Sequence, residues 1–420
     1  MPMLRRYEHR RAQIVLLPCL LLLLLCTQPA SPLKYTIVSS RNLHSPDFQS
    51  PKTSSSSSSP SSFTRTFVPS HKTPPNYGQY VAYNQVQNLC TSLRNTLSTL
   101  YILSAFDRQG SNVALTATLT FLSRDGAGMI STLLFARYTP PFSLQTDVKR
   151  WRYLADITCN VALICEFLSS YIYDLPPAIF TATLCATNAM KACCGMMAGA
   201  SAGPIDFYWA GRDVKNLPDL SSKSAAQGTF SNGLGLILGA ILSKAAAKKS
   251  KGNGLAYFGY FLLTVFHLLS NARMLRAVAF NFVNYERLVV LVKEWKRGVI
   301  LSPSEVAKVE PLLFRIFGWG GGGRKLGGVL INEDDNDDSD WEGGLCKTKE
   351  GTVLLEDATT NSNENAQLCK AHFVAMHEGT QVEALADWAG FSKAAVEKGW
   401  DFDLSTLPDE GVRFVVKIEE

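Results

Sequence analysis

The chain has 420 residues, of which 46% are hydrophobic and 18% are charged. This is too hydrophobic for a disordered protein, and the length suffices for two or three units with separate cores. The formal net charge of +5 hides three blocks, because residues 1–75 carry a net +7, residues 76–330 a net +12 and residues 331–420 a net −14.

A basic, apolar middle followed by an acidic end favours a membrane-facing body joined to a soluble tail, since anionic lipid headgroups attract Lys and Arg. Nucleic-acid binding is the competing interpretation of the basic block. We reject it, because the basic residues lie between apolar runs and form no stripe interleaved with aromatic residues, and no nucleic-acid-binding module is recognisable. The expected partner is therefore a lipid membrane.

Residues 1–30 are predicted to be a signal-like segment. Arginines between Arg5 and Arg11 precede an apolar run from Ile14 to Cys26, which small and polar residues follow. This order is typical of a signal peptide, and the run is shorter than the roughly 20 residues that a spanning helix needs.

Residues 31–75 are predicted to be a transit-like or disordered segment, because they are rich in Ser, Thr and Pro and contain Asp47 as their one acidic residue. A signal-like segment directly before a transit-like one resembles the bipartite presequence of proteins in plastids with extra bounding membranes. We expect delivery to a plastid membrane. A secretory signal followed by a linker, or a mitochondrial or other endomembrane destination, stays open.

Residues 76–316 are predicted to form a mainly α, membrane-associated body. The candidate helices are apolar segments separated by short polar joints, at 92–106, 112–136, 153–173, 176–200, 229–246 and 254–280. The last two, joined by a lysine-rich turn, are expected to form a helical hairpin. The alternative is a soluble core, because each segment is near or below the length of a spanning helix.

Beyond the apolar segments, residues 285–316 read as two helices, the second opened by Ser302 or Ser304. A glycine run and an acidic run then predict a linker over 317–365. Residues 366–420 are predicted to form a small C-terminal α+β unit, with helical patterns followed by a strand-like end.

No metal or cofactor site is predicted. The ten cysteines have no CxxC pair, and the six histidines are scattered. Gly318, Gly320 and Gly323 satisfy G-x-G-x-x-G, but no strand precedes them and an acidic run follows soon after. The acidic run resembles the start of an EF-hand, but Ser339 stands where the glycine is required.

The most informative cluster lies at the start of an apolar helix, where Asp147, Lys149, Arg150, Trp151, Arg152 and Asp156 crowd ten positions. Arg152 and Asp156 are four apart and can pair on a helix, while Trp151 can lie at the boundary between water and lipid. One interpretation is an interfacial anchor with internal ion pairs. The other is a site for an anion or a cofactor phosphate.

Three motifs in order resemble those of the root UVB sensitive (RUS) family: SRDGAG, then DVKRWRYLAD, then NLPDLSSKSAAQG. The likeness covers roughly residues 80–420, although Arg124, Pro218 and Ser224 depart from the usual pattern. The candidate functional residues are those that match the motifs: Asp125, Gly126, Lys149, Arg150, Trp151, Arg152, Asp156, Asn216, Asp219, Lys223 and Gln227.

The resemblance implies a membrane-associated protein, in plants often linked to plastids, to growth under UV-B and to vitamin B6 homeostasis, sometimes in complexes between family members. It implies no established reaction, and no nucleophile, base and orienting group can be assembled from the sequence. We therefore expect a non-enzymatic membrane protein that binds or transports a small anionic metabolite. Its polar residues inside the helices would line the site: Asp125, Asp156, Asn160, Glu166, Asn188 and Lys191. The alternative is a peripheral adaptor that acts through complexes with family members.

Overall fold

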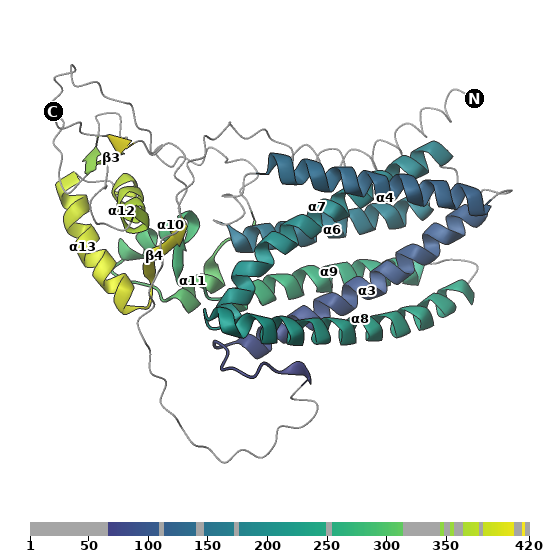
Figure 1. The fold of residues 1–420 in the computed structure, drawn as a ribbon, viewed down its shortest axis with the longest axis horizontal. Coiled ribbons are helices and arrows are strands. Elements are labelled where there is room, and N and C mark those ends of the chain that lie inside the picture. Colours follow the sequence, from purple (N-terminus) through teal and green to yellow (C-terminus); the bar gives the residue numbers. More distant parts are fainter. Residues whose placement is uncertain are drawn as a thin grey trace, which may run out of the picture.

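The computed structural model describes residues 66–108, 113–139, 147–171, 176–248, 254–313, 345–347, 353–356, 364–377, 381–406 and 414–415. Within these residues the chain is mostly helical, as predicted, with a bundle of long helices at one end and a smaller α+β region at the other (Figure 1). The signal-like segment, most of the transit-like segment and the glycine and acidic runs lie outside the described residues.

The bundle consists of long helices, which are α3 (Tyr77–Arg108), α4 (Val113–Tyr138), α6 (Val148–Tyr171), α7 (Pro177–Trp209), α8 (Leu217–Lys248) and α9 (Gly254–Ala277). The shortest have 24 residues, which is about 36 Å at the rise of an α-helix and exceeds the thickness of a bilayer core. The helices are longer than the apolar segments predicted for them, because polar flanks extend them beyond their apolar runs.

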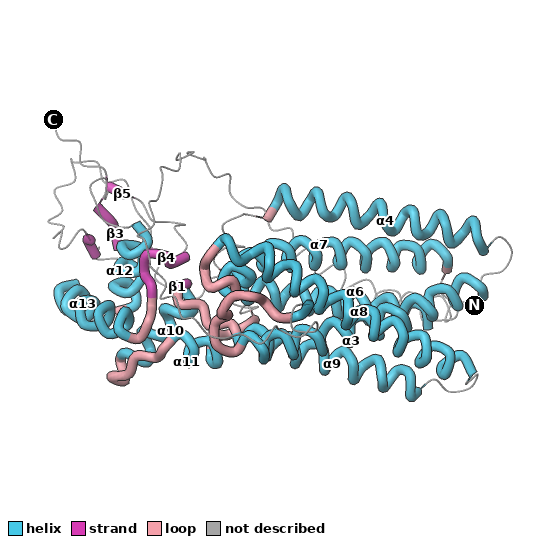
Figure 2. The backbone as a smooth tube through the Cα atoms, turned by 60° about the horizontal axis from the view of Figure 1, so that its bottom comes forward, coloured by secondary structure: helices cyan, strands magenta, loops and turns pink. Residues whose placement is uncertain are grey.

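Helix α3 is the centre of one half of the bundle and packs against α6, α8 and α9, while α7 packs against α4 and α6 (Figures 1 and 2). The expected hairpin of α8 and α9 is wrong, since both helices pack on α3 instead of on each other. Glycines allow the close approach of α8: a Cβ added to Gly235 would lie 2.5 Å from Ser92 Cβ, and one added to Gly239 would lie 2.8 Å from Thr96 Cβ.

The end of the bundle is closed by aromatic and aliphatic side chains where α7 and α9 end. Trp209 is 1% exposed and packs with Met274, Leu275 and Val278. Gly211 follows α7 with a φ of +68°, in the left-handed region that glycine adopts without steric cost. The short helix η1 (Val214–Asn216) then leads into α8.

The α+β region contains β1 (Phe282–Asn284), α10 (Tyr285–Trp295), α11 (Pro303–Val309), β2 (Leu345–Lys347), β3 (Val353–Glu356), α12 (Glu364–Met376), α13 (Gln381–Glu397), β4 (Asp401–Thr406) and β5 (Phe414–Val415). The predicted start of α11 is confirmed: Ser302 is its N-cap, and the Ser302 N–H donates to the Glu305 carboxylate at 2.7 Å. Strand β1 pairs in parallel with β4, and β3 pairs antiparallel with β2 and in parallel with β5.

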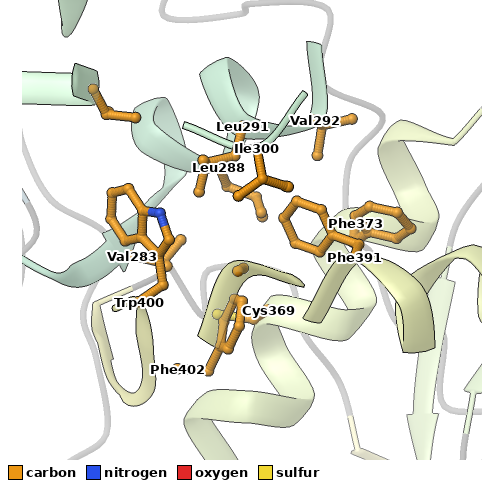
Figure 3. Close-up of a cluster of buried hydrophobic side chains, with 12 residues drawn as sticks. Val283, Leu288, Leu291, Val292, Ile300, Cys369, Phe373, Phe391, Trp400 and Phe402 are labelled. Atoms are coloured by element: carbon orange, nitrogen blue, oxygen red, sulfur yellow. The ribbon is translucent and has the colours of Figure 1, made fainter. Parts of the chain in front are cut away.

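A single hydrophobic core joins the two sequence segments of this region (Figure 3). Val283, Leu288 and Leu291, from β1 and α10, pack against Phe373 and Phe391 from α12 and α13. Trp400 adds an indole N–H that donates to the Leu301 carbonyl at 2.8 Å. The core therefore forms only when the residues before the predicted linker meet those after it.

Candidate functional site: a polar bundle interior with an apolar outer surface

A chain of hydrogen bonds runs through the interior of the bundle between α3, α6 and α9. The Gln87 amide donates to Asp156 Oδ2 at 2.9 Å, and Asn160 Nδ2 lies 2.9 Å from His267 Nδ1. All four side chains are at most 7% exposed. The spacing of Arg152 and Asp156 allows them to pair on the helix, but the Asp156 carboxylate accepts from Gln87, while Arg152 donates to the Ala198 carbonyl at 3.4 Å.

Arg94 lies at the centre of this chain and is 0% exposed. Its guanidinium donates to Asn160 Oδ1, to Thr264 Oγ1 at 3.2 Å and to the Cys90 carbonyl at 3.3 Å. These acceptors are all neutral, and Arg94 Nη2 is buried with no hydrogen-bond partner among the described residues. The carboxylate of Asp156, in the same network, acts on this guanidinium electrostatically, but no hydrogen bond joins the two among the described residues. A buried guanidinium whose direct partners are neutral favours an anion in contact with it.

Sequence reasoning missed Gln87, Arg94 and His267, although their spacing carried a signal. Gln87, Arg94 and Ser98 are seven and four residues apart, and Thr264 and His267 are three apart, so each set lies on one face of its helix. A search for a polar face on each apolar helix would have identified these residues of α3 and of α9.

A second polar group connects α3, α6 and α7. The Lys191 ammonium lies 2.5 Å from Glu166 Oε2, and Thr187 donates to Glu166 Oε1 at 3.1 Å. Ser98 donates to the same carboxylate at 3.4 Å. Glu166 is 2% exposed, so the predicted internal pairing of ionisable groups is found here.

A cluster of buried charges lies where the bundle meets the α+β region. Lys149, at the start of α6, donates to Glu310 at 2.8 Å, and Arg287 of α10 donates to the same carboxylate at 2.9 Å. Burial opposes the ionisation of Glu310, but Arg287 and Lys149 outweigh it and lower the pKa of Glu310 to about 2. Burial lowers the pKa of Lys149 to about 8, although Glu310 acts in the opposite direction.

The neighbouring motif residues belong to the same junction. Arg150 lies 2.7 Å from Glu286 and donates to the Pro311 carbonyl at 3.2 Å. Burial raises the pKa of Asp147, which lies 3.9 Å from Arg150. Trp151 is half-buried and packs against a cluster that contains Phe135 of α4 and Cys193 and Met197 of α7. Asp147, Lys149 and Arg150 thus hold the two ends of the molecule together, while Trp151 packs inside the bundle.

The third motif anchors the residues that precede α3. Asp219 accepts from the backbone N–H and hydroxyl of Ser70, at 2.7 and 2.8 Å, and lies 3.7 Å from Lys223. Gln227 donates to the Phe67 carbonyl at 2.6 Å. Asn216 donates to the Ala210 carbonyl at 3.0 Å and so holds the turn between α7 and α8. Residues 66–75, within the predicted transit-like segment, therefore pack on α8.

The first motif lies apart from the other two. Asp125 has a side chain that is 63% exposed and lies 3.7 Å from its neighbour Arg124. A Cβ added to Gly126 would meet nothing within 4 Å, but one added to Gly128 would lie 2.6 Å from Asn188 Nδ2. Asn188 donates to the Arg124 carbonyl at 2.9 Å, so this motif sets the contact between α4 and α7.

The outer surface of the bundle carries large apolar side chains. Helix α4 runs along one edge of the bundle. The opposite edge is formed by α8 in the view of Figure 1 and by α9 in the view of Figure 2. Their outward-facing residues are between 49% and 72% exposed. We call these the apolar outer faces: Leu115, Leu119, Leu122, Met129 and Leu133 of α4, Phe230, Ile237 and Ile241 of α8, and Phe258, Phe261, Phe266 and Leu269 of α9.

By length and composition, the described residues hold one helix that could cross a membrane, over Val214–Lys244, and only 22% of its apolar window is buried. They hold no group of three or more His, Cys, Asp or Glu side chains that could bind a metal ion. The predicted site residues thus fall into an interior network, a junction, an N-terminal anchor and the α4–α7 contact.

Comparison with known proteins identifies the family to which this chain belongs. Residues 53–298 match the model of the vitamin B6 photo-protection and homoeostasis domain. The chain is 31% identical over 242 residues to Protein root UVB sensitive 3 of Arabidopsis thaliana, covering 57% of this chain and 52% of that protein. It is 30% identical over 243 residues to RUS family member 1 of Dictyostelium discoideum, covering 57% and 45%.

A further relative is Protein root UVB sensitive 6 of Arabidopsis thaliana, at 23% identity over 250 residues, covering 58% of this chain and 47% of that protein. The chain spans about half the length of the curated relatives it matches. No solved structure matches it. Because the family model covers more than half of the chain, which also carries the three motifs in order, this protein belongs to the root UVB sensitive (RUS) family.

Proposed function

We propose that this RUS protein is embedded in a membrane and that the interior of its helical bundle binds or transports a small anionic metabolite. The observation that carries the proposal is the inverted distribution of side chains. Charged groups lie inside, at Arg94, Asp156 and Glu166, while the apolar outer faces are exposed.

Helix α8 illustrates the argument. Gln227, Ser231, Gly235 and Gly239 recur every four residues and face the rest of the bundle, where all four are buried. Phe230, Ile237 and Ile241 face outward and are at least 60% exposed. In water the apolar face of a helix turns toward the protein core, whereas lipid favours small and polar residues at helix contacts and apolar residues outside.

The charge inside the bundle supports an anion as the ligand. Glu166 has Lys191 as its counter-ion, whereas Arg94 has neutral acceptors and a free Nη2. Guanidinium groups bind carboxylates and phosphates in a bidentate manner. The description of the family domain refers to vitamin B6 homoeostasis. A phosphorylated form of vitamin B6 is a small anion whose phosphate a guanidinium group can bind.

The location that we propose is a plastid membrane, supported by the order of the signal-like and transit-like segments. Alkaline carbonate extraction of the tagged full-length protein from isolated plastids tests the membrane part of the proposal. Retention in the pellet is expected. Release into the wash would contradict embedding and would favour a peripheral adaptor that acts through complexes with family members.

Ligand binding is tested separately with the detergent-solubilised full-length protein and pyridoxal 5′-phosphate or inorganic phosphate as probes. We expect a rise in melting temperature with probe concentration, because a ligand that binds only the folded state stabilises it. Arg94→Gln should abolish the rise. The same rise in this variant would place the binding site elsewhere.

A further inference from the structure

Two buried side chains near Arg94 carry polar atoms that have no hydrogen-bond partner among the described residues. Asn271 of α9 is 0% exposed, and both its Nδ2 and its Oδ1 lack a partner. Gln87 of α3 is 4% exposed, and its Oε1 lacks a partner. Burying a polar atom without a hydrogen bond costs free energy. A bound molecule that supplies the missing partners would remove this cost.

The packing of α9 on α3 places these two side chains at one level of the bundle. The helices are antiparallel, as three contacts show: the ring centres of Tyr101 and Tyr257 are 6.4 Å apart, Arg94 donates to Thr264 at 3.2 Å, and the Arg273 guanidinium lies 5.9 Å from the centre of the Tyr83 ring. By this register Asn271 lies beside residues 85–87 of α3. It is also one turn after His267, on the face of α9 that contacts Asn160 of α6.

Asp156 of α6 belongs to the same level, because it accepts from Gln87 Nε2 at 2.9 Å. A carboxylate only accepts, so the Gln87 amide turns its nitrogen to Asp156 and leaves Oε1 free. Three helices thus contribute acceptors at this level, which are the Asp156 carboxylate, Gln87 Oε1 and Asn271 Oδ1. A group that complements them is a hydrogen-bond donor.

The guanidinium of Arg94 lies about one helical turn from this level. Its Nε donates to the Cys90 carbonyl at 3.3 Å, so the side chain bends back along α3 toward Gln87. It also contacts Asn160, which is one turn after Asp156. One turn is about 5 Å, so a small molecule can reach from the guanidinium to the acceptors.

We propose that the small anion bound by Arg94 also carries a hydrogen-bond donor, such as an ammonium group, and that Gln87, Asp156 and Asn271 bind this donor. The inference rests on the function proposed above and specifies the class of its ligand. An anion without a donor would lie near the buried Asp156 carboxylate and be repelled by it. A donor on the same molecule binds the carboxylate and offsets this repulsion.

The experiment measures the melting temperature of the detergent-solubilised full-length protein with two matched probes, phosphoethanolamine and ethyl phosphate. Both are small phosphate monoesters, but only phosphoethanolamine carries an ammonium group. From the rise in melting temperature with probe concentration, the wild-type protein should bind phosphoethanolamine about 10-fold more tightly, since a hydrogen bond to a charged group contributes such a factor.

Asn271→Leu removes the amide and keeps a side chain of similar size. It should abolish the preference for phosphoethanolamine and leave the binding of ethyl phosphate unchanged, because Arg94 is intact. The variant should be at least as stable as the wild-type protein, because it buries two fewer unpaired polar atoms. Asn271→Ala makes the same test if leucine prevents folding.

Thr158→Val is the matched control. The Thr158 hydroxyl is also buried without a partner among the described residues, but it is two residues from Asp156 and so on another face of α6. This variant should retain the preference for phosphoethanolamine.

Equal binding of the two probes by the wild-type protein, tighter binding of ethyl phosphate, or a preference that survives in Asn271→Leu would overturn the inference and leave the anion site at Arg94 in place. The inference also fails if neither probe raises the melting temperature while inorganic phosphate or pyridoxal 5′-phosphate does. If none of the four compounds raises it, the function proposed above fails as well.

Discussion

The ammonium of Lys149 lies 2.8 Å from the carboxylate of Glu310, and both side chains are at most 5% exposed. The pair joins the first turn of α6 to the residues that follow α11, and Arg287 completes it from α10. The bundle and the α+β region are therefore held in one arrangement by buried charges as well as by hydrophobic contact.

Glu310→Gln is expected to destabilise the protein by about 3–5 kcal/mol, because it leaves Lys149 and Arg287 as buried charges without a counter-ion. The measurement is the unfolding of the detergent-solubilised variant by heat or denaturant. The matched control is Glu294→Gln, which removes an exposed pair with Arg297 and should cost less than about 1 kcal/mol. Equal losses in the two variants would contradict a structural role for the buried cluster.

The contribution of Glu310 to folding stability should depend on pH. The folded state lowers its pKa from 4.5 to about 2, so the unfolded chain takes up the proton first as the pH falls. The stabilisation is complete above about pH 4.5 and is lost as the pH falls toward 2. The difference in melting temperature between wild type and Glu310→Gln should therefore shrink between pH 6 and pH 3; a constant difference would argue against this ionisation.

Gly235→Ala is expected to destabilise the contact of α8 with α3 by about 1–3 kcal/mol, since the new methyl group would lie 2.5 Å from Ser92 Cβ. Gly233→Ala is the control on the same helix, because a Cβ there meets nothing within 4 Å. It should be neutral or stabilising by up to about 1 kcal/mol, as alanine favours helix. The measurement is the melting temperature of both variants relative to the wild-type protein.

Removal of residues 1–75 should lower the melting temperature relative to removal of residues 1–65. The longer deletion breaks the hydrogen bonds of Ser70 to Asp219 and of Phe67 to Gln227, with a cost of about 1–2 kcal/mol. Identical melting temperatures would show that the anchor contributes nothing to stability. Asp219→Asn in the shorter deletion should reproduce part of the loss.

Asp156→Ala is expected to abolish ligand-dependent stabilisation or transport while leaving the amount of protein in the membrane unchanged. The acid lies inside the bundle and accepts from Gln87. Asp125→Ala changes an exposed acid of α4 and should leave both properties intact. A drop in the membrane abundance of Asp156→Ala would instead indicate that the residue serves folding.

The apolar runs were sufficient to predict that the body is helical and where its helices lie, because long hydrophobic segments admit few other structures. Their ends were not predictable from hydrophobicity. The first turns of α3 contain Tyr, Gln and Asn residues, and they are helical because they pack against the end of the bundle, where Tyr77 and Tyr80 contact Trp209.

The arrangement of the motif residues in space could not be derived from the sequence. Lys149 and Glu310 are 161 residues apart, and nothing in the sequence around Glu310 marks it as the partner. The i, i+4 spacing of Arg152 and Asp156 suggested a local pair, yet Asp156 found a partner in α3. Local spacing describes which side chains can meet on one helix, and the packing of different helices decides which do.

The core shared by α10 and α12 has a consequence for the connectivity of the chain. Val283 and Phe373 belong to one core, so the segments that precede and follow the acidic stretch in the sequence are both fixed by folded structure. A protease cut within residues 317–344 would then leave two fragments that remain associated. The same stretch is a place where new termini or an inserted domain could be introduced, because the core and the β1–β4 pairing, not the peptide bond, hold its ends together.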